Sequence, residues 1–367
     1  MILLIVNGTP FTDFVNASVT LSLESMANDF SFTASAVSDF PSLKQGDEVI
    51  VIVDGSKVLT GFIDEVNGRD AEGDHLVTYT GRDKTGDFID SSINVINDIQ
   101  AGNNLTLKKL IEIVINHLGQ SLSVIDNFNP NPFNQAEDFV TPKAGQNALE
   151  FVNGYAKKRQ ALLSSDADGN ILITQSEPTE SGATVQSLRG STSNNVITQS
   201  WQVNASRVYN KYIHRGQLDL RALNFAGESS PEDVENQGGQ AINANARPGR
   251  QRVQVESESY SSEQLTDRAK WSSQLGDASA FRYNCAVKGH QQPNGGLWTV
   301  NTLVQVNSDV ANISRKMLLT SVTFQQGEGQ PTSTMLEMAE KNVYTIDDRL
   351  TSQRPVGSLG DAFSSLG

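Results

Sequence analysis

The chain has 367 residues, a hydrophobic fraction of 37% and a formal net charge of −14 at pH 7. This length allows two or three domains with their own cores. The acidic surface repels phosphate backbones, which excludes stable binding of nucleic acids. The alternative interpretation is that the acidity only keeps the protein soluble. The single cysteine, Cys285, excludes an internal disulfide. No apolar stretch reaches membrane-spanning or signal-peptide length, so we expect cytoplasmic synthesis and no membrane binding.

The first part of the chain has the alternation of apolar and polar residues that is typical of β-strands. Asp54-Gly55 lies between two such segments, Glu48–Val53 and Val58–Val66, and predicts a β-hairpin. Several short strands at this spacing predict a small barrel or sandwich. We therefore assign 1–95 to a first β-barrel, which residues 195–217 could alternatively complete.

The pattern becomes helical after Asn103. One predicted helix has Thr106 as its N-cap and Gly119 at its C-terminus. Its apolar face consists of Leu107, Leu110, Ile111, Val114 and Leu118. A second helix is predicted for Gln146–Arg159, and a hairpin around Asp168-Gly169 follows it. The apolar face of this second helix consists of Leu149, Val152, Tyr155 and Ala156. Residues 96–194 are thus predicted to be an α/β insert.

Strand patterns return after Asn195 and continue almost to the end. We assign 218–348 to a second β-barrel, with a long loop at 224–252 and a helix at 262–280. The segments around Leu59-Thr60 and Leu319-Thr320 share a strand, a turn and a similar return strand. Because hairpins resemble one another, an internal duplication stays open on this pattern alone. The predicted fold is mainly β with an α+β insert.

Motifs that would indicate catalysis are missing from the sequence. There is no nucleophile elbow and no dinucleotide fingerprint, and GRDKTG lacks the spacing of a phosphate loop. The four histidines are scattered, and Asp166–Asn170 fits a hairpin turn better than a calcium loop, because its glycine comes too early. Acidic pairs such as Asp347-Asp348 fit a solvated surface. We predict no enzyme activity, no catalytic residue and no metal or cofactor site.

Two segments resemble those of a known family: Val58–Val66 and GRDKTGDFIDSSI at Gly81–Ile93. Further blocks follow in the same order at Gln146–Gln175, Arg207–Gln217, Arg268–Ala278 and Leu297–Val306. The set resembles the baseplate hub proteins of Mu-like contractile-tailed phages, the tail protein P family. The residues that carry the signature are Gly81, Arg82, Asp83, Lys84, Thr85, Asp87 and Asp90. That family is similar in fold to the T-even phage hub and to the hub half of type VI secretion spike proteins.

The resemblance implies a structural role in a virion. Each chain would contribute two tail-tube-like β-barrels to a homotrimeric ring, which adapts the six-fold tail tube to the three-fold central spike. DNA would pass through the lumen without specific binding. The implied partners are the spike, the tail tube or a tube-initiator protein, and other baseplate proteins. The implied location is the tail baseplate, after synthesis in the bacterial host cytoplasm.

Two other classes of protein remain as alternatives. The hub of a type VI secretion or pyocin-like particle would share most of these patterns. A β-rich glycan-binding or hydrolytic tail protein would need clustered aromatic side chains in a cleft, whereas Trp201, Trp271 and Trp298 are far apart in the sequence.

The C-terminal tail, 349–367, is rich in Gly and Ser and has too few apolar residues to fold alone. We expect it to dock on a partner or a neighbouring subunit. Its candidate anchors are Val356, Leu359, Phe363 and Leu366. The alternative is that it folds back on its own barrel.

Overall fold

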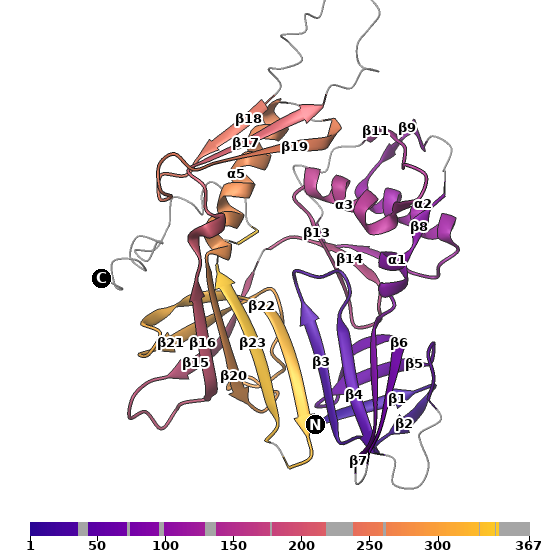
Figure 1. Ribbon diagram of the computed structural model, residues 1–367, viewed down its shortest axis with the longest axis vertical. Helices are drawn as coiled ribbons and strands as arrows, with labels where there is room; N and C mark the ends of the chain where they lie inside the picture. Colours follow the sequence, from indigo (N-terminus) through magenta and orange to yellow (C-terminus); the bar gives the residue numbers. More distant parts are fainter. Residues whose placement is uncertain are drawn as a thin grey trace, which may run out of the picture. The chain divides into compact units, whose positions relative to one another are not determined.

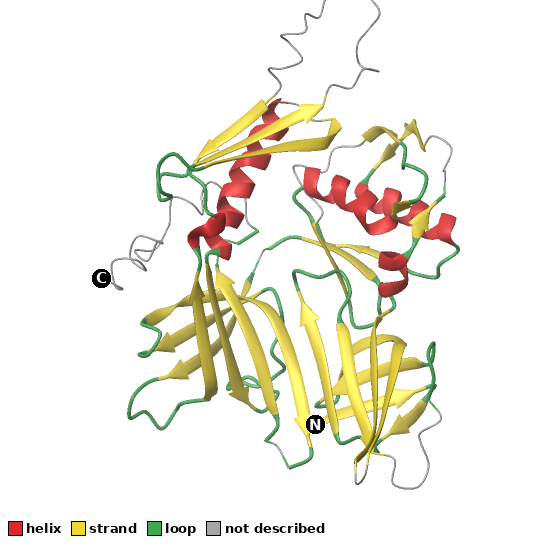
Figure 2. Cartoon of the chain, in the orientation of Figure 1, coloured by secondary structure: helices red, strands yellow, loops and turns green. Residues whose placement is uncertain are grey.

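The computed structural model confirms a mainly β chain with a helical insert (Figures 1 and 2). It describes residues 1–35, 43–71, 74–94, 99–128, 137–176, 178–217, 238–259, 262–329, 331–341 and 343–344. The chain forms two compact units. Unit 1 contains residues 1–200 and 283–338, and unit 2 contains residues 201–282 and the segment from 339 onward. None of the helices described is long and apolar enough to cross a membrane.

The N-terminal strands of unit 1 form an antiparallel array in the order β3-β4-β7-β6-β5-β1-β2. Their bounds are β1 Ile2–Val6, β2 Thr9–Phe11, β3 Asn16–Ser22, β4 Asp29–Ser35, β5 Glu48–Val53, β6 Ser56–Ala71 and β7 Asp74–Asp83. The predicted hairpin is confirmed, since β5 pairs with β6 across Asp54-Gly55. The rings of Phe32 and Tyr79 stack in the core with their centroids 4.9 Å apart.

A second group of strands in unit 1 comes from the C-terminal half of the chain. Its bounds are β15 Thr179–Ser187, β16 Val196–Val203, β20 Phe281–Lys288, β21 Thr302–Ser308, β22 Ile313–Gly327 and β23 Ser333–Glu340. The order is β16-β20-β23-β22, and β21 pairs with both β22 and β15. The residues of the possible internal repeat lie on β6 and β22: Leu59 and Leu319 are fully buried, and Thr60 and Thr320 are nearly so.

Pairing between β22 and β3 joins the two groups into one 13-stranded sheet. The two predicted barrels are therefore not confirmed, because no sheet in the described part of the chain closes on itself. Instead, β3 of the first strand group pairs with β22 of the second. The alternative in which 195–217 completes the first barrel is wrong: β16 pairs with β20, and β17 (Lys211–Gln217) lies in another sheet.

The α/β insert follows β7 and carries a core of its own. Its elements are α1 Gly86–Asp90, β8 Ser92–Ile93, β9 Ile99–Leu105, α2 Leu107–Leu118, β10 Val124–Asp126, β11 Glu137–Val140, β12 Gln146–Asn147, α3 Ala148–Lys158, β13 Leu162–Ser165 and β14 Ile171–Thr174. Both predicted caps of α2 are confirmed: the Thr106 side chain accepts a hydrogen bond from the Lys109 amide, and Gly119 adopts a left-handed conformation. On α3, Phe151 is buried and Leu149 only partly so, which corrects the predicted face.

Unit 2 contains a three-stranded sheet in the order β18-β17-β19. Its elements are η1 Ala205–Arg207, β17, β18 Gly238–Ile242, β19 Gln251–Ser259 and α5 Ser262–Ser279. The helix predicted at 262–280 is confirmed as α5. The loop predicted at 224–252 is partly wrong, because β18 lies within it, and its first part lies outside the described residues. The predicted domain 218–348 is divided between the two units.

Candidate functional site

The signature segment begins at the end of β7, where β6 and β7 approach closely. A Cβ atom on Gly81 would lie 2.0 Å from the Phe62 carbonyl oxygen and 2.6 Å from Cζ of Phe30. Side chains do not tolerate such distances, so glycine is the residue that fits here. The close approach fixes the direction in which the chain leaves β7 toward α1.

Asp83 is the buried centre of this segment, with 2% of its surface exposed. Its carboxylate accepts hydrogen bonds from the amides of Asn28 (2.8 Å) and Thr85 (3.0 Å) and from the Thr85 hydroxyl (2.6 Å). The Ser165 hydroxyl, on β13 of the insert, also donates to it. Burial raises the pKa of Asp83, and these hydrogen bonds limit that rise. Asp83 therefore links β4, β7 and the insert.

The charged residues around Asp83 are paired on the surface. Arg82 donates to Asp64 through Nε (2.8 Å) and to both carboxylate oxygens of Asp90 (3.1 and 2.6 Å). This bidentate contact lowers the pKa of Asp90. Lys84 pairs with Glu48 at 2.9 Å. Asp87 is exposed in the first turn of α1. These contacts account for the signature residues as parts of a structural junction.

The β13–β14 hairpin of the insert packs against the same junction. The Thr60 hydroxyl donates to the Ala167 carbonyl (2.8 Å), and Lys57 forms an ion pair with Asp168. Gly169 has a φ of +79°, and a Cβ there would lie 2.9 Å from the Thr60 carbonyl oxygen. The hairpin turn predicted at Asp168-Gly169 is confirmed, and it positions the insert on β6 and β7.

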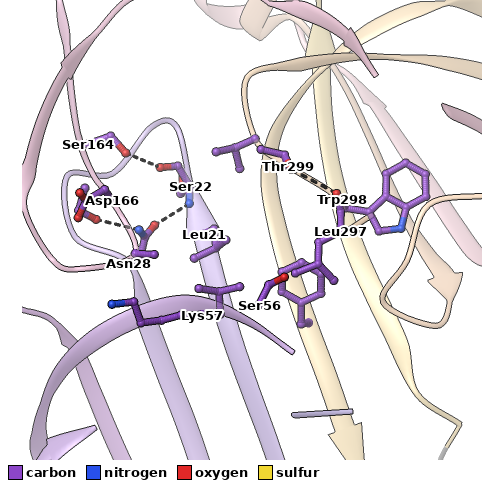
Figure 3. Close-up of a pocket in the computed structure, with 15 residues that line it drawn as sticks. Leu21, Ser22, Asn28, Ser56, Lys57, Ser164, Asp166, Leu297, Trp298 and Thr299 are labelled. Atoms are coloured by element: carbon purple, nitrogen blue, oxygen red, sulfur yellow. Dashed lines mark hydrogen bonds between the residues drawn. The ribbon is translucent and has the colours of Figure 1, made fainter. Parts of the chain in front are cut away.

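A pocket of about 400 Å³ lies beside this hairpin, within unit 1 (Figure 3). Its lining mixes polar and apolar side chains and includes Ser22, Asn28, Ser56, Lys57, Ser164, Asp166, Leu297, Trp298 and Phe324. Several of its polar groups already have protein partners. The Asn28 side chain accepts from the Ser22 amide (2.9 Å) and donates to the Ser165 hydroxyl (2.8 Å). The lining therefore carries no convergent set of charges that would specify a ligand.

Unit 2 holds a buried ionic cluster that the sequence analysis missed. His214 Nδ1 lies 2.5 Å from Glu256 Oε1, His214 Nε2 lies 2.9 Å from the Ser272 hydroxyl, and Arg268 Nη2 lies 3.4 Å from Glu256 Oε1. Burial by itself would raise the pKa of Glu256, but the His214 hydrogen bond and the Arg268 charge outweigh it, so the pKa is lowered. His214 and Glu256 are 42 residues apart in sequence and come together because β17 and β19 pair in parallel, which no local pattern reveals.

The geometry of this cluster argues for a structural role. An acid, a histidine and a serine in this order resemble a nucleophilic triad. His214, however, is only 2% exposed, and Ser272 lies in the middle of α5 instead of on a sharp turn. Within the described ranges, no group of three or more His, Cys, Asp or Glu could hold a metal ion. The predicted tail anchors, Val356 to Leu366, lie outside the described residues.

Comparisons with known proteins support a phage-tail origin for this architecture. Two family models match: "Mu phage baseplate assembly protein GpP-like, N-terminal" over residues 1–83 and "Mu phage baseplate assembly protein GpP, fourth domain" over residues 261–346. Baseplate hub protein gp44 of Escherichia phage Mu is 21% identical over 347 residues, which cover 93% of this chain and 88% of that protein.

Solved structures show the same fold. The 43 kDa tail protein of prophage MuSo2 from Shewanella oneidensis has a TM-score of 0.77 at 23% identity, covering 93% of this chain and 98% of that one. The tail protein from Neisseria meningitidis MC58 also has a TM-score of 0.77, at 17% identity, covering 94% and 98%. The E. coli c3393 protein, a component of the type VI secretion system, has a TM-score of 0.50 at 13% identity, covering 91% and 76%.

The fold is thus that of phage tail hub proteins. Within this class, the chain is similar in pattern to Mu-like baseplate hub proteins, since its residues 1–83 and 261–346 match the models of the N-terminal and fourth domains of the GpP-like family.

Proposed function

We propose that this structural hub forms a homotrimeric ring that adapts the six-fold tail tube to the three-fold central spike. The observation that carries the proposal is the β3–β22 pairing, which fuses two hairpin-containing strand groups of one chain into a single sheet. Two similar groups per chain give six positions in a trimer. A ring of this kind meets six tube subunits on one side and three spike subunits on the other.

Free strand edges favour association between copies. β16 and β2 lie at the two ends of the strand path, and each has one paired neighbour among the described strands. Unpaired backbone groups along such edges are natural sites for pairing with another chain. A ring would cover these edges, and an isolated chain would leave them open.

The negative charge of the chain fits a ring that DNA crosses. With a net charge of −14, a lumen built from this protein repels the phosphate backbone and does not retain it. We place the protein in the tail baseplate of a virion, after synthesis in the host cytoplasm. Its partners there are the spike, the tube or a tube-initiator protein, and other baseplate proteins.

The oligomeric state tests the ring directly. Sedimentation equilibrium at micromolar concentration should give about three times 39.8 kDa, and electron microscopy of the same sample should show rings. A chain that stays monomeric across this concentration range contradicts the proposal.

We further propose that the tail, 349–367, docks on the spike or the tube through Val356, Leu359, Phe363 and Leu366. Deleting residues 358–367 should leave trimer formation and melting unchanged and weaken assembly with these partners. Equal binding by the truncated and full-length hubs would show that the tail does not dock.

The absence of enzyme activity is also part of the proposal. The homologues are structural tail proteins, and the buried Ser272–His214–Glu256 arrangement offers a substrate no access. Purified protein should release no products from peptidoglycan or other glycans. Turnover that disappears in a Ser272→Ala variant, or on replacing a single Asp or Glu, would restore the hydrolytic tail protein as the better assignment.

A hub from a type VI secretion or pyocin-like particle is the second candidate, favoured by the likeness to the E. coli c3393 protein. The neighbouring genes separate the candidates. Capsid genes beside the tube and spike genes indicate a phage, and their absence indicates a secretion or pyocin-like particle.

A further inference from the structure

The small sheet of unit 2 has one covered face, against which α5 packs (Figure 1). Tyr212 and His214 of β17 point to this side and are buried. The helix lies so close that a Cβ on Gly239 would be 2.0 Å from the Thr266 amide nitrogen. Alternate residues of a strand point to opposite faces, so the neighbours of Tyr212 and His214 belong to the other face.

That other face is exposed and mixes apolar side chains with polar ones, Gln240 and Gln251 among them. Ile213 pairs in register with Val253, Arg215 with Val255, and Lys211 with Ile242, so these six residues share it. Ile242, Val253 and Val255 are 64%, 55% and 63% exposed. They are three of only seven large hydrophobic side chains that are exposed in the described part of the chain. Lys211 and Arg215 add positive charge to the same surface.

Such a face is unusual for a solvated surface. A sheet normally buries its apolar side chains against another layer, and exposed apolar patches mark interaction sites when they exceed a few hundred Å². The polar half of this sheet, with His214 and Glu256, is the half that α5 covers. The layer under α5 also buries Tyr212, Leu265 and Ala269, whereas the apolar side chains of the other face have no covering layer. This difference indicates that the exposed face meets a partner.

We propose that this face, formed by Lys211, Ile213, Arg215, Ile242, Val253 and Val255, is a contact between copies of this chain, an inference that rests on the homotrimer proposed above. Charge complementarity favours a second copy as the occupant. The chain carries 42 acidic against 28 basic residues and is negative as a whole, whereas the six residues of this face include two basic and no acidic ones.

The size of the face sets its role in the contact. Three strands with about five residues each cover roughly 250 Å². A stable interface buries about 800 Å² per partner, so the face is the apolar centre of a larger contact. In a three-fold ring the contact is heterologous: each copy uses this face once, against a different surface of its neighbour.

The test replaces apolar side chains at the centre of the face. Val253→Asp with Val255→Asp should weaken trimer formation at least tenfold in sedimentation equilibrium, because two charges would have to be desolvated. Val310→Asp is the matched control, since Val310 is 53% exposed elsewhere and its variant should assemble normally. Circular dichroism of all variants should match the parent, because the changed side chains are exposed and the fold of each chain is kept.

A second measurement tests whether the face is covered in the assembled protein without weakening the contact. The natural cysteine, Cys285, is buried, so V255C and V310C each introduce one reactive thiol. In the assembled protein the thiol of V255C should react with a maleimide at least tenfold more slowly than that of V310C. Equal rates, or a trimer that survives both aspartates, would overturn the assigned face and leave the trimer intact. A parent protein that is monomeric would instead overturn the proposed function.

Discussion

The insert and unit 2 both pack helices on a three-stranded sheet, yet the side chains between helix and sheet differ in kind. In the insert, Ile111 and Val114 of α2, Val152 of α3 and Ile171 of β14 are all fully buried in one apolar cluster. Under α5 of unit 2, the buried groups include the ionic cluster of His214, Glu256 and Arg268.

The difference separates two ways of holding a helix on a sheet. Apolar burial contributes in proportion to area and depends little on direction or pH. A buried ionic cluster adds little net stability, because desolvation offsets attraction, but it permits few arrangements and is costly to break. The insert should therefore tolerate conservative repacking, and unit 2 should respond strongly to the loss of one charge.

The largest effect is expected from Glu256→Gln. The change leaves the Arg268 charge buried without its carboxylate, which costs about 3–5 kcal/mol. Hydrogen-exchange protection of α5 should fall accordingly, while that of α2 and α3 stays unchanged. Glu263→Gln, at an exposed position in the first turn of α5, is the control and should change protection little.

The same carboxylate gives unit 2 a pH dependence. Because the folded-state pKa of Glu256 is lowered, its stabilisation is fully present above the ordinary glutamate pKa of 4.5 and is lost as the pH falls through the lowered folded-state pKa. Protection of α5 should therefore decline on acidification before that of α2. Glu256→Gln should remove this decline, and an equal decline in parent and variant would assign it to another group.

A comparable loss of stability is expected when a large buried side chain is removed from the core of the insert. Phe151→Ala removes a buried ring and should cost about 3–5 kcal/mol in chemical denaturation. Leu149→Ala should cost about 1 kcal/mol, because that side chain is only partly buried. Equal losses at the two positions would mean that α3 is rotated.

The smallest of the three effects concerns the junction between the insert and β7. Asp83→Asn turns an acceptor of four hydrogen bonds into a group that also donates, which should cost about 1–3 kcal/mol. Lys57→Ala breaks an exposed ion pair of the same junction and should cost about 0.2–1 kcal/mol. If Lys57→Ala costs more than Asp83→Asn, the surface pair and not the buried carboxylate holds the hairpin.

Local sequence patterns predicted those elements that a few neighbouring residues determine. The cap residues Thr106 and Gly119 and the turn at Asp54-Gly55 each act within a few residues of sequence, and the structure confirms them. The β3–β22 pairing and the His214–Glu256 contact join distant segments, so periodicity could not reveal them. The signature at Gly81 to Asp90 was recognised as a pattern, but its role as a junction depends on Ser165 and Thr60, which only the fold brings near.

The β3–β22 pairing has a consequence for synthesis. The outer edge of β3 pairs with residues Ser321–Gly327 of β22, so roughly 300 residues must be translated after β3 before this edge can pair. At about 5–20 residues per second this takes on the order of 15–60 s. During that interval the N-terminal strands can pair among themselves, but the edge of β3 stays open in addition to that of β2. Nascent hubs on the same messenger are then close enough for that edge to pair wrongly, so slow translation favours aggregation over a complete sheet.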